Sequence, residues 1–283
     1  MTESTPARSP TGGSRPLLHS LRAPAHWHQI DFISDLHLHA GDASTFAAWQ
    51  HYLQHTTAQA VFMLGDLFEA WVGDDVLSPP DTQAGTDNRF ELACARVLHR
   101  AGARLDLFFI CGNRDFLVGP QALQACAMQG LDDPCVLALG THRWLLSHGD
   151  ALCLDDSAYQ QFRAQVRSPA WQNAFLARPL AERQSVAREL RARSEQYKRA
   201  QPALVDVDGR AAQQWLHDAG ADVLIHGHTH QPADHRLTDT LRRTVLSDWD
   251  LQATPARAEV LRVWLSPSGD PMHCRRLAPA QAC

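Results

Sequence analysis

Lysine is almost absent from this chain of 283 residues, in which Lys198 is the only one and arginine supplies the rest of the basic charge. The net charge is also small, at −5, which argues against a general nucleic-acid binder because such proteins present a basic face to phosphates. The sequence has no apolar run of the roughly 18 residues that a membrane span requires. We therefore expect a protein that binds no nucleic acid and has no membrane-spanning helix.

Closely spaced cysteines are missing as well, because the seven cysteines are scattered and form no C-x-x-C pair. This pattern suggests neither a disulfide framework nor a zinc ribbon, and it fits a reducing cytoplasm best. Residues 1–27 lack the apolar core of a signal peptide and are rich in Pro, Ser, Thr, Gly and Arg. We expect residues 1–27 to be a disordered extension and residues 28–283 to form the folded domain.

The chain does contain a series of short apolar runs, each followed directly by polar residues. Five strands are expected at residues 30–34, 60–64, 105–110, 143–147 and 222–225. Helical patterns at residues 43–55 and 89–101 separate the first three strands. This alternation predicts an α/β fold with an open, largely parallel sheet whose strand ends meet at one edge. Two later runs, at residues 242–246 and 258–264, predict a second sheet that closes the domain.

Residues 155–200, between the fourth and fifth of these strands, have a different character. They contain no convincing strand, and they read as helices broken at Pro169 and Pro179. They also carry nine basic and five acidic residues, a surplus of four positive charges in a chain of net charge −5. We expect this segment to be a basic helical cap inserted into an acidic α/β body.

The residues that follow the five strands are of the types that bind divalent metal ions. They are Asp35, His37, Asp66, Asn113, His148, His228 and His230. Two cations about 3.5–4 Å apart neutralise phosphoryl oxygens and lower the pKa of bound water to near 7, which phosphate-ester hydrolysis at neutral pH requires. Each residue alone has an ordinary interpretation as a turn former, a helix cap, a surface histidine or part of a histidine-rich tract. Their coincidence at five strand ends favours the metal site.

Five short blocks of this sequence resemble those of a known family. The blocks are Asp35-Leu36-His37, Gly65-Asp66, Gly112-Asn113, His148-Gly149-Asp150 and Gly227-His228-Thr229-His230. In this order they look like the calcineurin-like metallophosphoesterases, over about residues 30–249. The resemblance implies a two-sheet sandwich flanked by helices (α/β/β/α), with the metal ions at the strand ends.

The same resemblance implies a role for each ligand residue. It places Asp35, His37 and His230 on one divalent metal ion and Asn113, His148 and His228 on a second, with Asp66 bridging the two. Manganese is the usual ion in the subfamily described next, whereas ligand chemistry alone also admits Fe, Co or Zn.

Flanking residues narrow the resemblance. Arg114 follows Asn113 where many members have histidine, and the stretches at residues 65–75 and 148–156 are similar to the UDP-2,3-diacylglucosamine hydrolases. A guanidinium binds phosphate in a bidentate way with a permanent charge, so we expect Arg114 to clamp a diphosphate. A surface ion pair between Arg114 and Asp115 is the alternative. The implied reaction hydrolyses the diphosphate of UDP-2,3-diacylglucosamine, a step of lipid A biosynthesis that gives UMP and 2,3-diacylglucosamine 1-phosphate.

The resemblance also implies catalytic roles for Asp66, Asn113, Arg114 and His228. The implied substrate contacts are Asn113, Arg114, Asp156, Ser194, Lys198 and His228. Apolar cap residues are expected either to line a slot for acyl chains or to form the ordinary apolar face of helices. They are Tyr159, Phe162, Val166, Trp171, Phe175, Leu176 and Leu180.

A lipid substrate and a basic cap predict peripheral contact with the cytoplasmic side of the inner membrane. Two alternatives stay open at this point. One is a metallophosphoesterase for another phosphodiester or a nucleotide, which would need neither Arg114 nor an apolar cap. The other is a non-catalytic scaffold of the same fold, which would be expected to have lost metal ligands.

Overall fold

A computed structural model of the chain describes residues 18–78, 88–200 and 206–283, without the side chains of residues 192–200. The described strands form two six-stranded mixed sheets. One sheet contains, in spatial order, β1 (Ser20–Arg22), β6 (Cys135–Leu139), β7 (His142–Leu146), β8 (Val223–His226), β10 (Arg242–Val245) and β9 (Ala233–Arg236). The other contains β12 (Pro271–Leu277), β11 (Val260–Leu265), β2 (Gln29–Ile33), β3 (Ala60–Leu64), β4 (Asp106–Ile110) and β5 (Gln129–Gly130).

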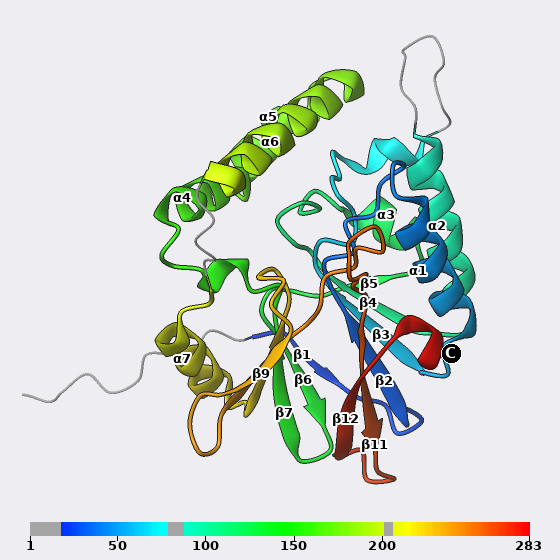
Figure 1. Cartoon of the computed structure of the whole chain (residues 1–283), viewed down its shortest axis with the longest axis vertical. Coiled ribbons are helices and arrows are strands. Elements are labelled where there is room, and N and C mark those ends of the chain that lie inside the picture. The colour runs from blue at the N-terminus through cyan, green and yellow to red at the C-terminus, as the bar shows by residue number, and fades with distance from the viewer. Residues whose placement is uncertain (1–17, 79–87, 201–205) are drawn as a thin grey trace, which may run out of the picture.

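Helices cover both outer faces of this sandwich. They are α1 (Ala43–His55), α2 (Arg89–Ala101) and α3 (Pro120–Ala125) on one side and α7 (Gly209–Ala219) on the other. Figure 1 shows the two sheets between these helices. The predicted α/β/β/α sandwich is confirmed.

Alternating side chains of the strands create the layers of the core. Ile30 and Phe32 of β2 belong to the apolar cluster between the two sheets, whereas Ile33 belongs to the cluster under α1 and α2. A third cluster joins β8 to α7 through residues such as Leu224 and Leu216. Burial of each side chain of this size contributes about 1.5–3 kcal/mol to the stability of the fold. Apolar packing on both faces of each sheet therefore stabilises the body.

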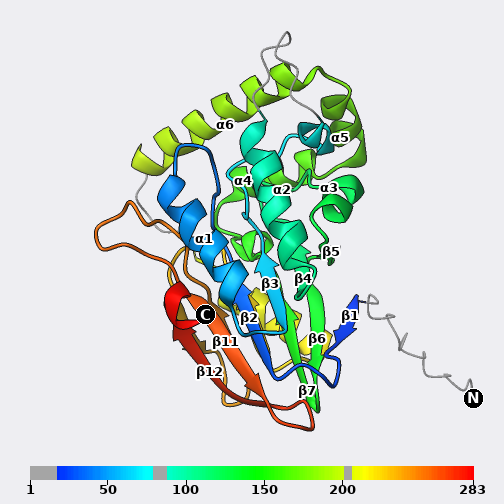
Figure 2. The same cartoon turned by 90° about the vertical axis from the view of Figure 1, so that its right-hand side faces the viewer.

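The cap consists of three helices, α4 (Ser157–Val166), α5 (Pro169–Leu176) and α6 (Leu180–Ala200). Pro169 occupies the first turn of α5, and the hydroxyl of Ser168 caps that helix by accepting the N–H of Trp171 at 3.3 Å. Proline is tolerated there because the first turn of a helix has unpaired N–H groups anyway. Figures 1 and 2 show the cap above the ends of β2, β3 and β4.

The prediction of one open parallel sheet followed by a separate second sheet is wrong. Strands β2, β3 and β4 are parallel neighbours in one sheet, whereas β7 and β8 are parallel neighbours in the other. Of the two later runs, β10 pairs with β8 and β11 pairs with β2, so each sheet receives one. The error arose because strand periodicity shows which residues are extended but not which strands pair. The carboxyl ends of both parallel sets nevertheless meet at one end of the sandwich.

The predicted boundary of the disordered extension is also wrong at its carboxyl end. Residues 20–22 form β1, which pairs in parallel with β6. Trp27 is 2% exposed, and its indole N–H donates to Oδ2 of Asp106 at 2.7 Å. A strand of three residues is too short to show an apolar periodicity in the sequence. Its extended conformation depends on pairing with β6. Residues 1–17 lie outside the described part of the chain.

Candidate active site

The backbone at the strand ends adopts a conformation that non-glycine residues rarely take. Asp35, His37, Asp66, His228 and His230 all have positive φ angles, between 47° and 66°. Such a conformation costs on the order of 1–3 kcal/mol per residue and persists only where the surroundings enforce it. These five positions include most of the residues predicted to bind metal, which marks the strand ends as the functional region.

Glycine is required at two of these turns because backbone and side chains approach closely. A Cβ atom on Gly112 would lie 2.1 Å from Oδ1 of Asp66, and one on Gly227 would lie 1.8 Å from Oγ of Ser34. No other residue type fits without displacing these groups. The glycines of the sequence blocks therefore allow the acidic and imidazole side chains to converge.

The carboxylate of Asp35 is fully buried, and its two oxygens have different surroundings. Oδ2 accepts hydrogen bonds from the hydroxyl of Ser34 and from the N–H of His228, the latter at 2.9 Å. Oδ1 has no hydrogen-bond partner and lies 3.3 Å from Nε2 of His230. Nε2 of His37 lies 3.3 Å from the same nitrogen of His230. These three residues, Asp35, His37 and His230, form a compact group that could hold a metal ion.

A second group lies beside the first. Oδ1 of Asn113 is 3.0 Å from Nε2 of His148 and 2.9 Å from Nδ1 of His228. Nδ1 of His148 lies 3.0 Å from the carbonyl oxygen of Leu64. A histidine that donates Nδ1–H to a carbonyl presents the lone pair of Nε2 to the site, as a metal ligand does.

Asp66 lies between the two groups. Its Oδ1 accepts the N–H of Arg114 at 2.8 Å. Its Oδ2 is 3.7 Å from Nε2 of His148 and 4.0 Å from Nε2 of His37. One oxygen is thus held by the backbone while the other faces both sets of imidazoles.

The electrostatics of the two groups suit divalent cations. Burial opposes the charge of Asp35, but nearby imidazoles, above all that of His230, hold the pKa of its carboxyl well below the usual range. Burial lowers the pKa of His228 to about 3, so its ring is neutral at physiological pH. Burial also disfavours the charged form of His148, yet Asp66 and Asp35 raise the pKa of this ring to about 9. A bound cation would replace that proton.

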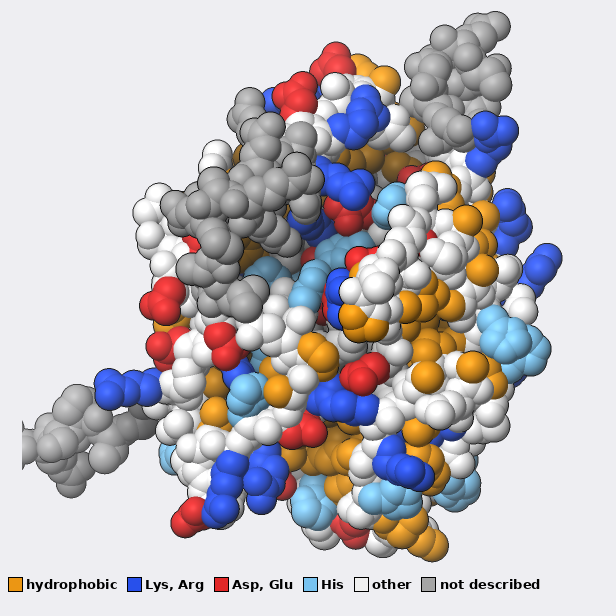
Figure 3. Space-filling view, viewed as in Figure 1, with side chains coloured by type: hydrophobic (Ala, Val, Ile, Leu, Met, Phe, Trp, Pro, Cys, Tyr) orange, Lys and Arg blue, Asp and Glu red, His pale blue; other side chains and the backbone are white. Residues whose placement is uncertain are grey.

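These observations satisfy a simple test of whether the residues fit metal ions. A buried carboxylate oxygen without a hydrogen-bond partner, at Asp35, points at neighbouring imidazole nitrogens. The seven predicted ligand residues offer the mixed nitrogen and oxygen set that divalent transition metals accept. The structure brings all seven together at one end of the sandwich, and Figure 3 shows histidine side chains in the hollow beneath the cap.

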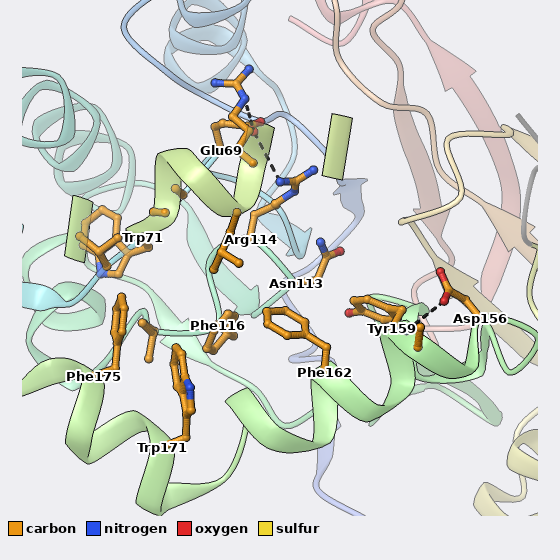
Figure 4. A pocket seen from close by; sticks show the side chains of 17 residues that line it. Glu69, Trp71, Asn113, Arg114, Phe116, Asp156, Tyr159, Phe162, Trp171 and Phe175 are labelled. Carbon is orange, nitrogen blue, oxygen red and sulfur yellow. Dashed lines mark hydrogen bonds and ion pairs between the residues drawn. The ribbon is translucent and has the colours of Figure 1, made fainter. Parts of the chain in front are cut away.

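A pocket of about 460 Å³ opens between this region and the cap. Its walls are mostly apolar, and both the strand-end loops and α4–α6 contribute to them. Figure 4 shows Trp71 and Phe175 at one end, Asp156 and Tyr159 at the other, and Arg114 between them. Of the seven apolar cap residues predicted to line a slot, four do so: Tyr159, Phe162, Trp171 and Phe175.

Arg114 lines this pocket and lies 3.8 Å from Oε1 of Glu69. The alternative of a surface ion pair with Asp115 is wrong. Asp115 is fully buried, and it accepts the N–H groups of Leu67 and Gly112, both at 2.7 Å. Asp115 therefore holds two strand-end loops together and leaves Arg114 free to face the pocket.

Asp156 serves both as a helix cap and as part of the pocket wall. Its side chain accepts the N–H of Tyr159 at 2.9 Å at the start of α4. Ser194 and Lys198 lie on α6, but their side chains are outside the described part of the chain.

Four of the six cap arginines whose side chains are described contact the body. Nε of Arg163 donates to the buried Asp150 at 2.8 Å, and Arg183 binds both oxygens of Asp75. Among the described side chains, Arg191 is the cap arginine that lines the pocket. Several described basic residues of the cap therefore attach it to the body, and one of them, Arg191, also faces the pocket.

Comparison with known proteins identifies the family. The model of the calcineurin-like phosphoesterase family matches residues 28–232. A UDP-2,3-diacylglucosamine hydrolase of Chromobacterium violaceum is 44% identical over 78% of this chain and 90% of its own length. Those of Chromohalobacter salexigens and Aromatoleum aromaticum are 39% and 43% identical, covering 82% and 77% of this chain and 91% and 88% of their own lengths. The chain belongs to the UDP-2,3-diacylglucosamine hydrolase family of calcineurin-like phosphoesterases.

Within this member of the hydrolase family, sequence reasoning missed several residues that support the site. Glu69, Asp115 and Asp150 stand inside the motifs, so a search for buried acids near the ligands could have found them. Arg167 had no such signal. Its guanidinium donates to the carbonyl of Gly112 at 2.9 Å and lies 5.5 Å from the ring centre of Phe116, which only the folded cap makes possible.

Proposed function

We propose that the protein hydrolyses the diphosphate bond of UDP-2,3-diacylglucosamine, a step of lipid A biosynthesis that gives UMP and 2,3-diacylglucosamine 1-phosphate (lipid X). The observation that carries this proposal is the junction of two environments. A cluster of metal-type ligands meets an apolar pocket of about 460 Å³, with Arg114 at the boundary. Such a site suits a substrate that has a diphosphate at one end and acyl chains at the other.

We assign Asp35, His37 and His230 to one divalent ion and Asn113, His148 and His228 to the other. Asp66 bridges them in this assignment, because its Oδ2 faces imidazoles of both sets. When bound, the two ions supply charge neutralisation on the phosphoryl oxygens and a water of lowered pKa. We propose manganese as the resident ion because it is the usual ion of the subfamily that the sequence resembles, and the mixed nitrogen and oxygen ligand set accepts it along with Fe, Co or Zn.

The chain's own residues would orient the diphosphate. Arg114 offers a planar, permanently charged fork at the pocket wall, and Asn113 and His228 lie beside it at the edge of the metal cluster. Burial keeps the ring of His228 neutral, because it lowers the pKa of this histidine to about 3. We propose catalytic roles for Asp66, Asn113, Arg114 and His228. In this proposal the neutral ring of His228 acts as a metal ligand and does not donate a proton.

Other substrate contacts are proposed at the cap. Asp156 lines the polar end of the pocket, and Ser194 and Lys198 lie on α6. The aromatic side chains at the other end provide an apolar lining for acyl chains, and they include Trp171 and Phe175, stacked at 4.7 Å. We therefore propose that the acyl groups of the substrate bind at the cap and its diphosphate at the strand ends.

We further propose that the protein acts in the cytoplasm, docked peripherally on the inner membrane. No helix in the described ranges is long and apolar enough to cross a membrane. Four large apolar side chains of the cap region are exposed: Leu154, Phe162, Leu176 and Leu190. Arg178 and Arg188 are also exposed, whereas other cap arginines bind the body. Exposed apolar residues together with a few cations favour contact with an anionic lipid surface.

The two alternative functions lose support. A phosphodiesterase for small nucleotides has no need of an apolar pocket of this size, and a scaffold has no reason to keep seven convergent ligand side chains. The test incubates the purified protein with Mn²⁺ and UDP-2,3-diacylglucosamine and measures UMP. We expect UMP and lipid X in equal amounts; the absence of both, with metal bound, would reject the proposal.

A further inference from the structure

The carboxylate of Glu69 serves two different parts of the molecule with its two oxygens. Oε2 lies 3.3 Å from Nδ1 of His37, a residue of the metal cluster. Oε1 lies 3.0 Å from Nε of Arg191 on α6 and 3.8 Å from NH1 of Arg114. The side chain of Glu69 is 12% exposed, and Figure 4 shows it on the pocket wall beside Arg114.

The contact with His37 determines which ring nitrogen is available to a metal ion. Nε2 of His37 faces the cluster, 3.3 Å from Nε2 of His230 and 4.0 Å from Oδ2 of Asp66. A neutral imidazole that presents Nε2 as a lone pair carries its proton on Nδ1. Oε2 of Glu69, at 3.3 Å, is the carboxylate oxygen beside this Nδ1, which has no other hydrogen-bond partner. A small rotation of either side chain would let Glu69 accept the Nδ1–H, and an acceptor of this kind fixes both the tautomer and the orientation of a ligand ring.

The contact with Arg191 ties the same carboxylate to the cap. Arg191 belongs to α6, so its pairing with Glu69 brings a helix of the cap against the rim of the metal cluster. Arg114, our candidate diphosphate clamp, approaches the same oxygen. One side chain thus contacts a ligand residue, a substrate-facing arginine and a cap helix.

We propose that Glu69 is a positioning residue that couples the metal centre to the cap, by orienting His37 through one oxygen and holding Arg191 and Arg114 through the other. This inference rests on the proposed function of the metal cluster. It adds a residue that touches no ion and acts through its neighbours.

Glu69→Gln is the most direct test because it preserves shape and size. An amide has one acceptor oxygen and one NH₂ donor, so it can serve the N–H of His37 or that of Arg191, but not both. Titration calorimetry on chelator-treated protein should show that the variant binds Mn²⁺ about 10- to 100-fold more weakly at one site, the usual effect of losing such a supporting contact. Its kcat should fall as well, because Arg114 loses a partner.

Two matched variants separate the metal effect from general loosening of the cap. Arg191→Gln removes only the cap partner of Glu69. Asp75→Asn weakens the ion pair between Asp75, which is half exposed, and the buried Arg183. This pair is another attachment of α6, and it touches no ligand residue. Both should raise the KM for a diacylated substrate, and both should leave the Mn²⁺ affinity within about twofold of the wild type.

Glu69→Asp provides a second test, since it keeps the charge but withdraws the carboxylate from Nδ1 of His37. The same weakening of Mn²⁺ binding is expected, with metal-free thermal unfolding close to that of the wild type. Wild-type Mn²⁺ affinity in either folded variant would overturn the inference while the proposed function stands. A wild-type protein that binds no Mn²⁺ and releases no UMP would instead contradict the proposed function itself.

Discussion

The strand-end loops and the cap face each other across one pocket but are stabilised in different ways. In the loops, Asp35, Asp66 and His148 are at most 2% exposed, and each is held by backbone groups. Among the described side chains of α4–α6, only Val166, Phe175 and Arg183 are buried. The loops are preorganised by buried polar contacts, whereas the cap is attached by arginine contacts and by the packing of apolar side chains such as Phe175 and Trp171 on the body. This difference supports the proposal that the loops determine the reaction and the cap determines the substrate.

The largest effect is expected where the two ligand groups meet. Asp66→Asn should reduce turnover of any phosphate substrate by about three orders of magnitude or more, because several kcal/mol of charge stabilisation would depend on the proposed bridge. Steady-state kinetics with thermal unfolding as the fold control would measure this. Full activity with unchanged metal content would remove Asp66 from the bridging position.

A smaller loss is expected at the boundary between the regions. Arg114→Lys keeps the charge but loses the planar fork, so kcat should fall by roughly two orders of magnitude, equivalent to about 3 kcal/mol. Metal content and the unfolding temperature should stay the same. Kinetics equal to those of the wild type would show that Arg114 does not clamp phosphate.

In the cap, the loss should depend on the substrate. Phe162 lines the pocket and is 39% exposed, so Phe162→Glu can place a charge in the lining without burying it. We expect about a tenfold or larger loss of kcat/KM for UDP-2,3-diacylglucosamine, since a large apolar contact contributes about 1.5–3 kcal/mol. Hydrolysis of a small phosphodiester should be unchanged.

Leu176→Glu is the matched control, because Leu176 is 41% exposed on α5 and does not line the pocket. With both substrates presented in detergent, where membrane docking plays no part, this variant should hydrolyse each of them at the wild-type rate. Phe175 is a poor site for this test: it is 6% exposed, and a buried charge there would damage the cap itself. Equal losses of both substrates in Phe162→Glu would indicate misfolding rather than a lost acyl contact.

The smallest effect concerns Asp156, which caps α4 and lines the pocket. Asp156→Ala should lower the free energy of unfolding by about 1 kcal/mol and kcat/KM several-fold, whereas asparagine, an equally good cap, should restore only the stability. Chemical denaturation and kinetics on both variants separate the two roles. If asparagine restores activity too, Asp156 acts on substrate only through the start of α4.

The sequence predicted features that depend on short local motifs, such as metal-type residues after apolar strands. It did not predict features that depend on contacts between distant segments. The convergence of the seven predicted ligand residues could be foreseen because each follows an apolar strand inside a short motif. The pairing of β10 with β8 and of β11 with β2 could not, because nothing local in either run distinguishes the two sheets. The contact of Arg167 with Gly112 was equally hidden, since it depends on where α4 ends relative to a loop of the body.

The central claim is that metal-dependent chemistry at the strand ends acts on a lipid-linked nucleotide held by the cap. The most direct test strips the purified protein with a chelator, restores Mn²⁺ to half of the sample and supplies UDP-2,3-diacylglucosamine in detergent micelles. UMP and 2,3-diacylglucosamine 1-phosphate should appear in equal amounts in the Mn²⁺ sample alone. Hydrolysis of a small phosphodiester without UMP release from the lipid substrate would contradict the account.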